Sequence, residues 1–151
     1  MFSKTAALVL LVFSGCHSGS APLPAPRQRL SDYISKSLNV SGPSDRNELL
    51  TYLTGDAKIK LQSWSDEEFR IEFLTKKRQF VKLTINEIKN ISSEEMGITY
   101  ELVYLDTAKG QGARITNKKL AQLKLESGKW MIAEVKSVKE LVEYKNEMSL
   151  P

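Results

Sequence analysis

The sequence predicts an α+β fold in which N-terminal helices pack on one face of a bent, four-stranded antiparallel sheet. Two observations support this prediction. Apolar residues recur at helical spacing up to residue 74 and at every second position from residue 81 onward. Helices and strands therefore come in two separate blocks along the chain, which is typical of α+β domains.

The first part of the helical block contains two clear helices. Residues 27–39 carry one continuous apolar stripe. A second helix is predicted to begin at a cap formed by Ser44 and to end at Gly55. The weak alternation of residues 58–64 is compatible with either a helix or a short irregular segment.

A third helix has a clear start signal at Ser65 and Glu68. This pair has the spacing of a capping box, in which each side chain bonds the backbone amide of the other residue. Phe69 and Phe73 are expected on the buried side of the helix. The basic residues 76–78 are expected in its last turn, where cations complement the helix dipole.

Four strands are predicted after residue 79, with approximate ranges 81–85, 98–105, 115–125 and 130–138. A bulge is expected near Glu87, where the alternation changes phase. Residues 126–129 are predicted to form a hairpin turn. The inward side of the last strand is expected to contain Met131, Ala133 and Val135.

The start of the chain has the features of an export signal. Residues 6–13 are eight consecutive apolar residues, which is the size of a signal-peptide hydrophobic region and too short to span a membrane. The small residues Ser14 and Gly15 then precede Cys16, the only cysteine of the chain. The sequence therefore predicts export and cleavage near this point.

Residues 11–16, Leu-Val-Phe-Ser-Gly-Cys, resemble the lipobox of bacterial lipoproteins, with Phe13 where leucine is usual. The resemblance implies that residues 1–15 are removed and that Cys16 is lipidated, which anchors the protein firmly in a membrane. His17 follows the cysteine. By analogy with enteric bacteria, the absence of aspartate there favours the outer membrane, facing the periplasm. The alternative is an ordinary signal peptide with an incidental cysteine.

Composition divides the remainder into a tether and one domain. Residues 16–26 comprise the lipidated cysteine and a Pro/Ser-rich tether, which is expected to be extended. Residues 27–148 are long enough for a single α+β domain. The 22 basic and 18 acidic residues give a net charge of +4 and are interspersed, so no nucleic-acid partner is expected.

The helices, the bent sheet and the closing hairpin of residues 123–135, Leu-Lys-Leu-Glu-Ser-Gly-Lys-Trp-Met-Ile-Ala-Glu-Val, resemble the nuclear-transport-factor-2-like (cystatin-like) superfamily. The resemblance implies a cone whose concave sheet face can enclose a ligand cavity. The superfamily contains both enzymes and non-catalytic binding modules, so the resemblance does not determine the function.

The predicted domain lacks the commonest catalytic side chains. The only histidine and the only cysteine, His17 and Cys16, precede it, which excludes imidazole and thiolate chemistry within it. No cofactor and no metal are expected. Ketosteroid isomerases of the resembled superfamily combine a carboxylate with tyrosine. Here Glu101 lies on the opposite strand face from Tyr100, so the two do not converge.

The expected protein is therefore a lipid-anchored, non-catalytic binding or structural module of the bacterial cell envelope. Its expected partners are the membrane, through the lipid, and an envelope protein or cell-wall component. The alternative is a small-molecule binder or enzyme that uses a cavity on the concave sheet face. Tyr100, Tyr104 and Trp130 are the candidate residues of a pocket or partner face. The sequence does not predict the oligomeric state.

Overall fold

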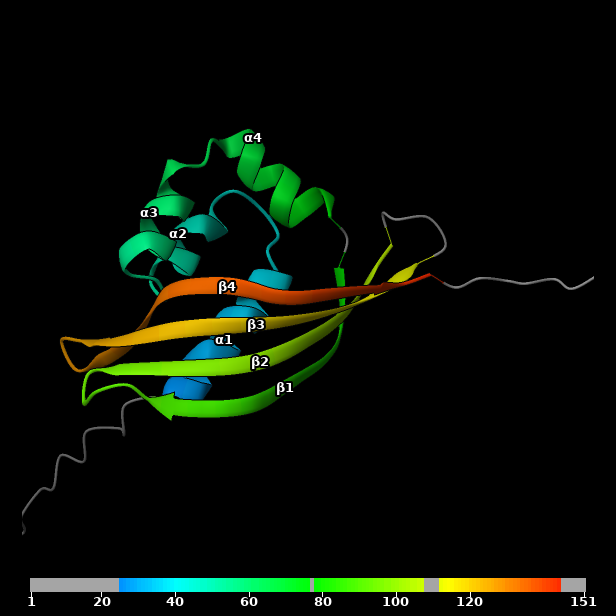
Figure 1. Cartoon of the computed structure of the whole chain (residues 1–151). Coiled ribbons are helices and arrows are strands. Elements are labelled where there is room, and N and C mark those ends of the chain that lie inside the picture. Colours follow the sequence, from blue (N-terminus) through cyan, green and yellow to red (C-terminus); the bar gives the residue numbers. More distant parts are fainter. Residues whose placement is uncertain (1–24, 77, 108–111, 145–151) are drawn as a thin grey trace, which may run out of the picture.

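The computed structural model describes residues 25–76, 78–107 and 112–144, and within them helices precede one antiparallel sheet (Figure 1). The helices are α1 (Pro26–Leu38), α2 (Asp45–Leu50), α3 (Gly55–Ser63) and α4 (Asp66–Phe69), which continues as a π-helical segment, η1 (Arg70–Thr75). The sheet has the order β1 (Arg78–Asn90), β2 (Glu95–Asp106), β3 (Ala113–Glu126) and β4 (Lys129–Glu143). The predicted α+β class is confirmed. The predicted signal peptide, Cys16 and the tether up to residue 24 lie outside the described residues.

Helix α1 crosses the whole sheet. It begins at Pro26, a residue favoured in the first turn because it lacks an amide hydrogen. Its inward side chains Leu30 and Ile34 are buried, and the helix contacts both edge strands, β1 and β4. Figure 1 shows α1 lying across the strands, with α2, α3 and α4 gathered beside β4. One face of the sheet is thus covered by helices.

The predicted end of the second helix at Gly55 is wrong. Helix α2 ends at Leu50, and Gly55, with a φ angle of 51°, is the first residue of α3. The segment between them pairs with β4 instead of continuing the helix. The Thr54 amide donates to the Ile132 carbonyl at 2.9 Å, and the Ile132 amide donates to the Tyr52 carbonyl at 2.9 Å. This pairing, which is not local in sequence, fixes where α3 begins.

The capping box of the next helix is confirmed. The Ser65 amide donates to the Glu68 carboxylate at 2.7 Å, and the Glu68 amide donates to Ser65 Oγ at 3.2 Å. Phe69 is fully buried at the end of α4. Segment η1 then continues the same helical rod toward the first strand.

The predicted bulge near Glu87 is also confirmed. The pairing of β1 with β2 shifts register between Ile85 and Glu87, and a second shift lies between Phe80 and Lys82. At the other side of the sheet, Ser127 and Gly128 both have positive φ angles, 49° and 75°. They form the tight turn predicted between β3 and β4.

The predicted inward face of the last strand is partly wrong. Leu123 pairs with Ile132 and Gln122 with Glu134, so Ala133 is an extra residue that breaks the alternation. Ile132 is therefore fully buried against the helices, where the simple alternation placed Met131. After the bulge Val135 returns to the helix-facing side, as predicted, and contacts the core. Strand β4 also continues to Glu143, beyond the predicted limit.

Candidate functional site

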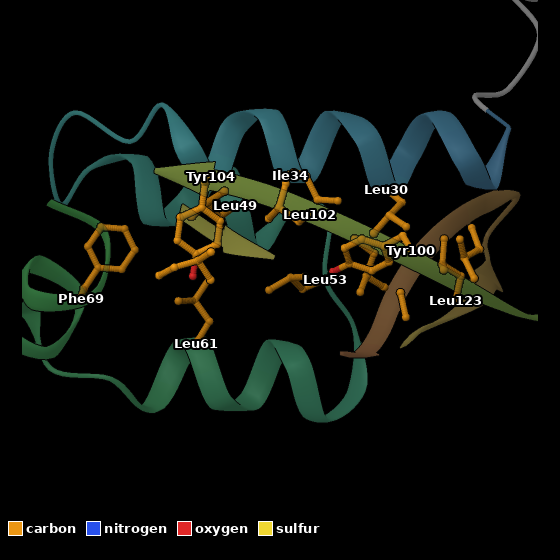
Figure 2. Close-up of a cluster of buried hydrophobic side chains, with 14 residues drawn as sticks. Leu30, Ile34, Leu49, Leu53, Leu61, Phe69, Tyr100, Leu102, Tyr104 and Leu123 are labelled. Carbon is orange, nitrogen blue, oxygen red and sulfur yellow. The ribbon is translucent and has the colours of Figure 1, made fainter. Parts of the chain in front are cut away.

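A cavity of about 480 Å³ lies between the helices and the helix-facing side of the sheet. Its floor is apolar and includes the buried side chains of Ile34 on α1, Leu61 on α3 and Leu102 on β2. Figure 2 shows Ile34 and Leu61 approaching from the two helices toward Tyr104 and Leu102 on the strand between them. The cavity falls in the size range of ligand pockets, about 300–1,000 Å³.

Two of the three predicted site residues line this cavity. Tyr100 and Tyr104 lie on the same side of β2 and are 3% and 8% exposed. Burial raises the pKa of both hydroxyls, so they stay protonated at neutral pH and can donate hydrogen bonds. A third tyrosine, Tyr33 on α1, also lines the cavity, and burial raises its pKa to about 12.

Trp130, the third predicted residue, lies elsewhere. It pairs with Leu125 beside the β3–β4 turn, packs against the core and does not line the cavity. Besides Tyr33, the aromatic side chains that line it from the helical side are Trp64 and Phe73, whose ring centroids are 6.0 Å apart. Phe73 has helical spacing from Phe69, which made it predictable as a buried residue but not as a cavity residue.

Polar side chains occupy helix-facing positions in the middle of the sheet. Asn117 pairs with Glu140, and the next helix-facing residue of β3, Lys119, pairs with Ser137. All four side chains line the cavity. The Asn117 amide nitrogen donates to a Glu140 carboxylate oxygen at 2.8 Å, while its own Oδ1 is buried without a hydrogen-bond partner among the described residues. A ligand with a donor group can satisfy this oxygen.

The sequence contained a signal for two of these residues. Asn117 and Lys119 fall at the same alternate positions as Ile115 and Ala121, both of which are buried on the helix side. Polar residues in such a series are expected only where a cavity or partner receives them. Glu140 was not predictable in this way, because β4 shifts register twice before it.

Lys119 has an unusual environment for a lysine. Its side chain is half-buried in the cavity wall, and it has no ion pair or hydrogen bond with any residue that the structure describes. Burial lowers the pKa of its ammonium group, and repulsion from Arg78 lowers it further. The carboxylates of Glu72 and Glu140 attract the ammonium group, but neither forms an ion pair with it, and the net effect of the surroundings is to disfavour the charge.

The cavity wall also carries an ion cluster in which the charges are paired. Glu72 of η1 accepts a hydrogen bond from Arg78 at 2.6 Å and another from Lys76. Burial alone would raise the pKa of Glu72, but these two hydrogen bonds together lower it. The Arg78 guanidinium lies 5.5 Å from the centre of the Tyr104 ring, and its Nε is buried without a partner among the described residues.

Two strand carboxylates, Glu101 on β2 and Glu134 on β4, do not line the cavity with the tyrosines. Glu101 does not line the cavity, in agreement with its predicted position on the opposite face of β2. Glu134 forms an ion pair with Lys136 at 2.9 Å and is also outside the cavity wall. Neither residue is therefore placed to act with Tyr100 or Tyr104.

Among residues 25–76, 78–107 and 112–144, no three His, Cys, Asp or Glu side chains come together as a metal site. None of the helices in these ranges has the length and apolar character needed to cross a membrane.

In fold, the chain is similar to a SEC-C motif containing protein from Rhodopseudomonas palustris. The solution structure of that protein matches with a TM-score of 0.51 and 13% sequence identity, over 75% of each chain. At this identity the likeness concerns the fold alone. No protein-family model matches the sequence, and no curated protein matches it.

Proposed function

We propose that the protein is a non-catalytic binding module that takes a small molecule into the cavity between its helices and its sheet. The observation that supports this proposal is the cavity of about 480 Å³ with an apolar floor and converging polar groups. The polar groups are those of Tyr100, Tyr104, Asn117 and Lys119. A packed interior would not retain an unpaired lysine and an unpartnered amide oxygen, because each destabilises the fold.

The proposal includes the predicted location in the cell envelope. Lipid on Cys16 would anchor the chain, with the periplasmic side of the outer membrane as the expected site. The Pro-rich tether of residues 17–26 would span up to roughly 30 Å if extended. Since α1 begins at Pro26, the folded domain would start where the tether ends.

We also propose that the fold is a nuclear-transport-factor-2-like cone. The support for it is the helical layer on one face of the sheet, the register shifts in β1 and β4, and the cavity beneath the helices. These are the features that such a cone needs in order to curve its sheet around a ligand.

A neutral fluorescent probe tests the proposed binding. N-phenyl-1-naphthylamine carries no charge and fluoresces strongly in apolar surroundings, so it reports access to the cavity. The full mature chain is expected to bind it saturably at one site. Substitution of the cavity residue Ala57 by Phe should abolish this binding by filling the space beside Leu61.

The matched control is Lys58→Phe, on the exposed side of the same helix. It adds the same ring outside the cavity and should leave probe binding unchanged. Circular dichroism establishes that both variants are folded. Absence of saturable binding to the native chain, or equal binding by the native chain and Ala57→Phe, would show that the cavity is not a ligand site.

A protein partner is the second candidate function, and one observation favours it. Strand β4 forms one edge of the sheet, and residues 52–54 pair with only a short part of it. Val138 and Leu141, on the rest of this edge, are 60% and 49% exposed. Exposed edges with apolar residues are templates for pairing with another chain. A photo-crosslinking residue at position 141 should then capture one specific envelope protein in intact cells, whereas a monomeric protein without crosslinks would argue against this role.

A further inference from the structure

The cavity is apolar at its floor and polar at its mouth. If it binds a ligand as proposed, this difference indicates the class of ligand. The floor residues Leu53, Leu61 and Leu102 are buried. The lining residues Lys60 and Lys76 are exposed, so the cavity meets solvent on their side. A ligand that fits both ends has an apolar part and a polar head.

The charge of the polar end is positive. Four cationic side chains and two carboxylates line the cavity, which gives it a net formal charge of +2. The two carboxylates already have partners: Glu72 binds Lys76 and Arg78, and Glu140 accepts from Asn117. A cationic head group would therefore have to displace one of these partners.

Two of the four cations, Lys60 and Lys119, form no side-chain ion pair or hydrogen bond with the described residues. Lys60 is exposed, whereas Lys119 is half-buried and lies at a central position. Lys119 pairs across the sheet with Tyr100 on β2 and with Ser137 on β4. Tyr100 is buried in the apolar part of the core, whereas Ser137 is exposed. Lys119 thus lies at the boundary between the floor and the mouth, where the head of a bound amphiphile would be.

We propose that the cavity binds an amphiphile with a single anionic head group, a carboxylate or a phosphate, that pairs with Lys119. The apolar part of the ligand lies against Tyr100 and Leu102. The ammonium group then gains the charge-assisted hydrogen bond that the fold does not supply. The Arg78 Nε, also unpartnered among the described residues, is the second donor available at this end.

Displacement of N-phenyl-1-naphthylamine from the full mature chain tests the proposal. The competitors are decanoate, decyl phosphate, decanol and decyltrimethylammonium, each below its micelle concentration. These compounds share one alkyl chain and differ in the head group. We expect at least one of the two anions to bind about tenfold or more tightly than decanol, since a charge-assisted hydrogen bond is worth that much, and the cation to bind more weakly than decanol. The better anion identifies the head group.

Three variants locate the effect. Lys119→Met should retain the neutral probe but lose the preference for anions, and Lys119→Arg should keep that preference. Lys118→Met is the matched control, because Lys118 points to the other face of β3 and is exposed. It should behave like the native chain.

The outcomes separate this inference from the proposed function. If the native chain does not bind the neutral probe, the cavity is not a ligand site and both proposals fail. If the probe binds but neither anion exceeds decanol, or if folded Lys119→Met keeps the preference, only the anionic ligand class is overturned. If Lys119→Met does not fold, the comparison of head groups on the native chain decides.

Discussion

Lys119 shows how a single residue can oppose the stability of its own fold. Its neighbours at the alternate positions of β3, Ile115 and Ala121, are buried and apolar. The alternation of these residues was readable from the sequence, but the cavity was not, because its walls come from α1, α3, η1 and all four strands. The position of Lys119 among apolar residues of β3 therefore indicated a site, but it did not show which residues form the rest of the cavity.

Replacement of Lys119 by Met should stabilise the protein by about 1 kcal/mol at neutral pH, because it removes a half-buried charge that has no partner among the described residues. The measurement is the free energy of unfolding in urea. Lys118→Met, on the exposed face, should change it much less. A clear loss of stability in Lys119→Met would mean that the ammonium group has a stabilising contact.

The same residue predicts a pH dependence. The pKa of Lys119 is lower in the folded chain than in the unfolded chain, so the unfolded chain binds more protons between the two pKa values. The stability of the native protein, relative to Lys119→Met, should therefore rise as the pH increases through the lowered pKa toward the normal lysine value. Groups that act on this titration are Arg78, Lys60, Glu72 and Glu140. A difference between the two proteins that is independent of pH would contradict the environment described for Lys119.

At the scale of elements, local signals and the bulge in β1 were predictable, but the pairings of β4 were not. The capping box at Ser65 and the turn at Gly128 depend on residues close in sequence, and both are confirmed. The start of α3 at Gly55 depends on hydrogen bonds to β4, which is far away in sequence. The bulge at Ala133 depends on how β4 pairs with β3, which the alternation of β4 alone does not reveal. The error at Met131 therefore came from the assumption that β4 alternates without interruption.

The bulge in β4 can be tested by comparing two neighbouring substitutions. Ile132→Ala should reduce the free energy of unfolding by about 2–4 kcal/mol, since Ile132 is fully buried and its truncation leaves a cavity. Met131→Ala should cost clearly less, because Met131 is only partly buried. A larger loss of stability in Met131→Ala than in Ile132→Ala would instead support an uninterrupted alternation in which Met131 faces the helices.

The start of α4 provides a second test at this scale. Ser65→Ala removes the hydroxyl that accepts from the Glu68 amide, and it should cost about 1 kcal/mol in thermal or urea unfolding. Ser35→Ala, on the exposed side of α1, is the control and should be neutral or slightly stabilising, because alanine favours helix. Equal effects of the two changes would show that the capping box contributes nothing.

For the whole molecule, the α+β class and its order of elements were predictable, because helical and strand periodicities separate along the chain. The cavity was not, because it depends on how far α1 and α3 stand from the sheet. Tyr100 and Tyr104 were correctly placed on one face of β2, whereas Trp130 was grouped with them although it lies outside the cavity wall. The predicted membrane anchor concerns residues outside those the structure describes.

The anchor is tested on the whole chain in bacterial cells. Cys16→Ala should abolish incorporation of labelled palmitate and release the protein from the membrane fraction, because no acyl chains would then hold it. Ser14→Ala keeps a small residue before the cysteine and should leave both properties unchanged. Membrane retention of Cys16→Ala would contradict lipidation at this residue.

The proposed ligand would occupy the space beside Tyr100 and Tyr104. Isotope-filtered nuclear Overhauser measurements on the labelled protein with unlabelled N-phenyl-1-naphthylamine test it most directly. We expect contacts from the probe to the ring protons of these two tyrosines and to Leu61 on α3. Contacts only to exposed residues such as Val138 and Leu141, or no contacts at saturating probe, would contradict it.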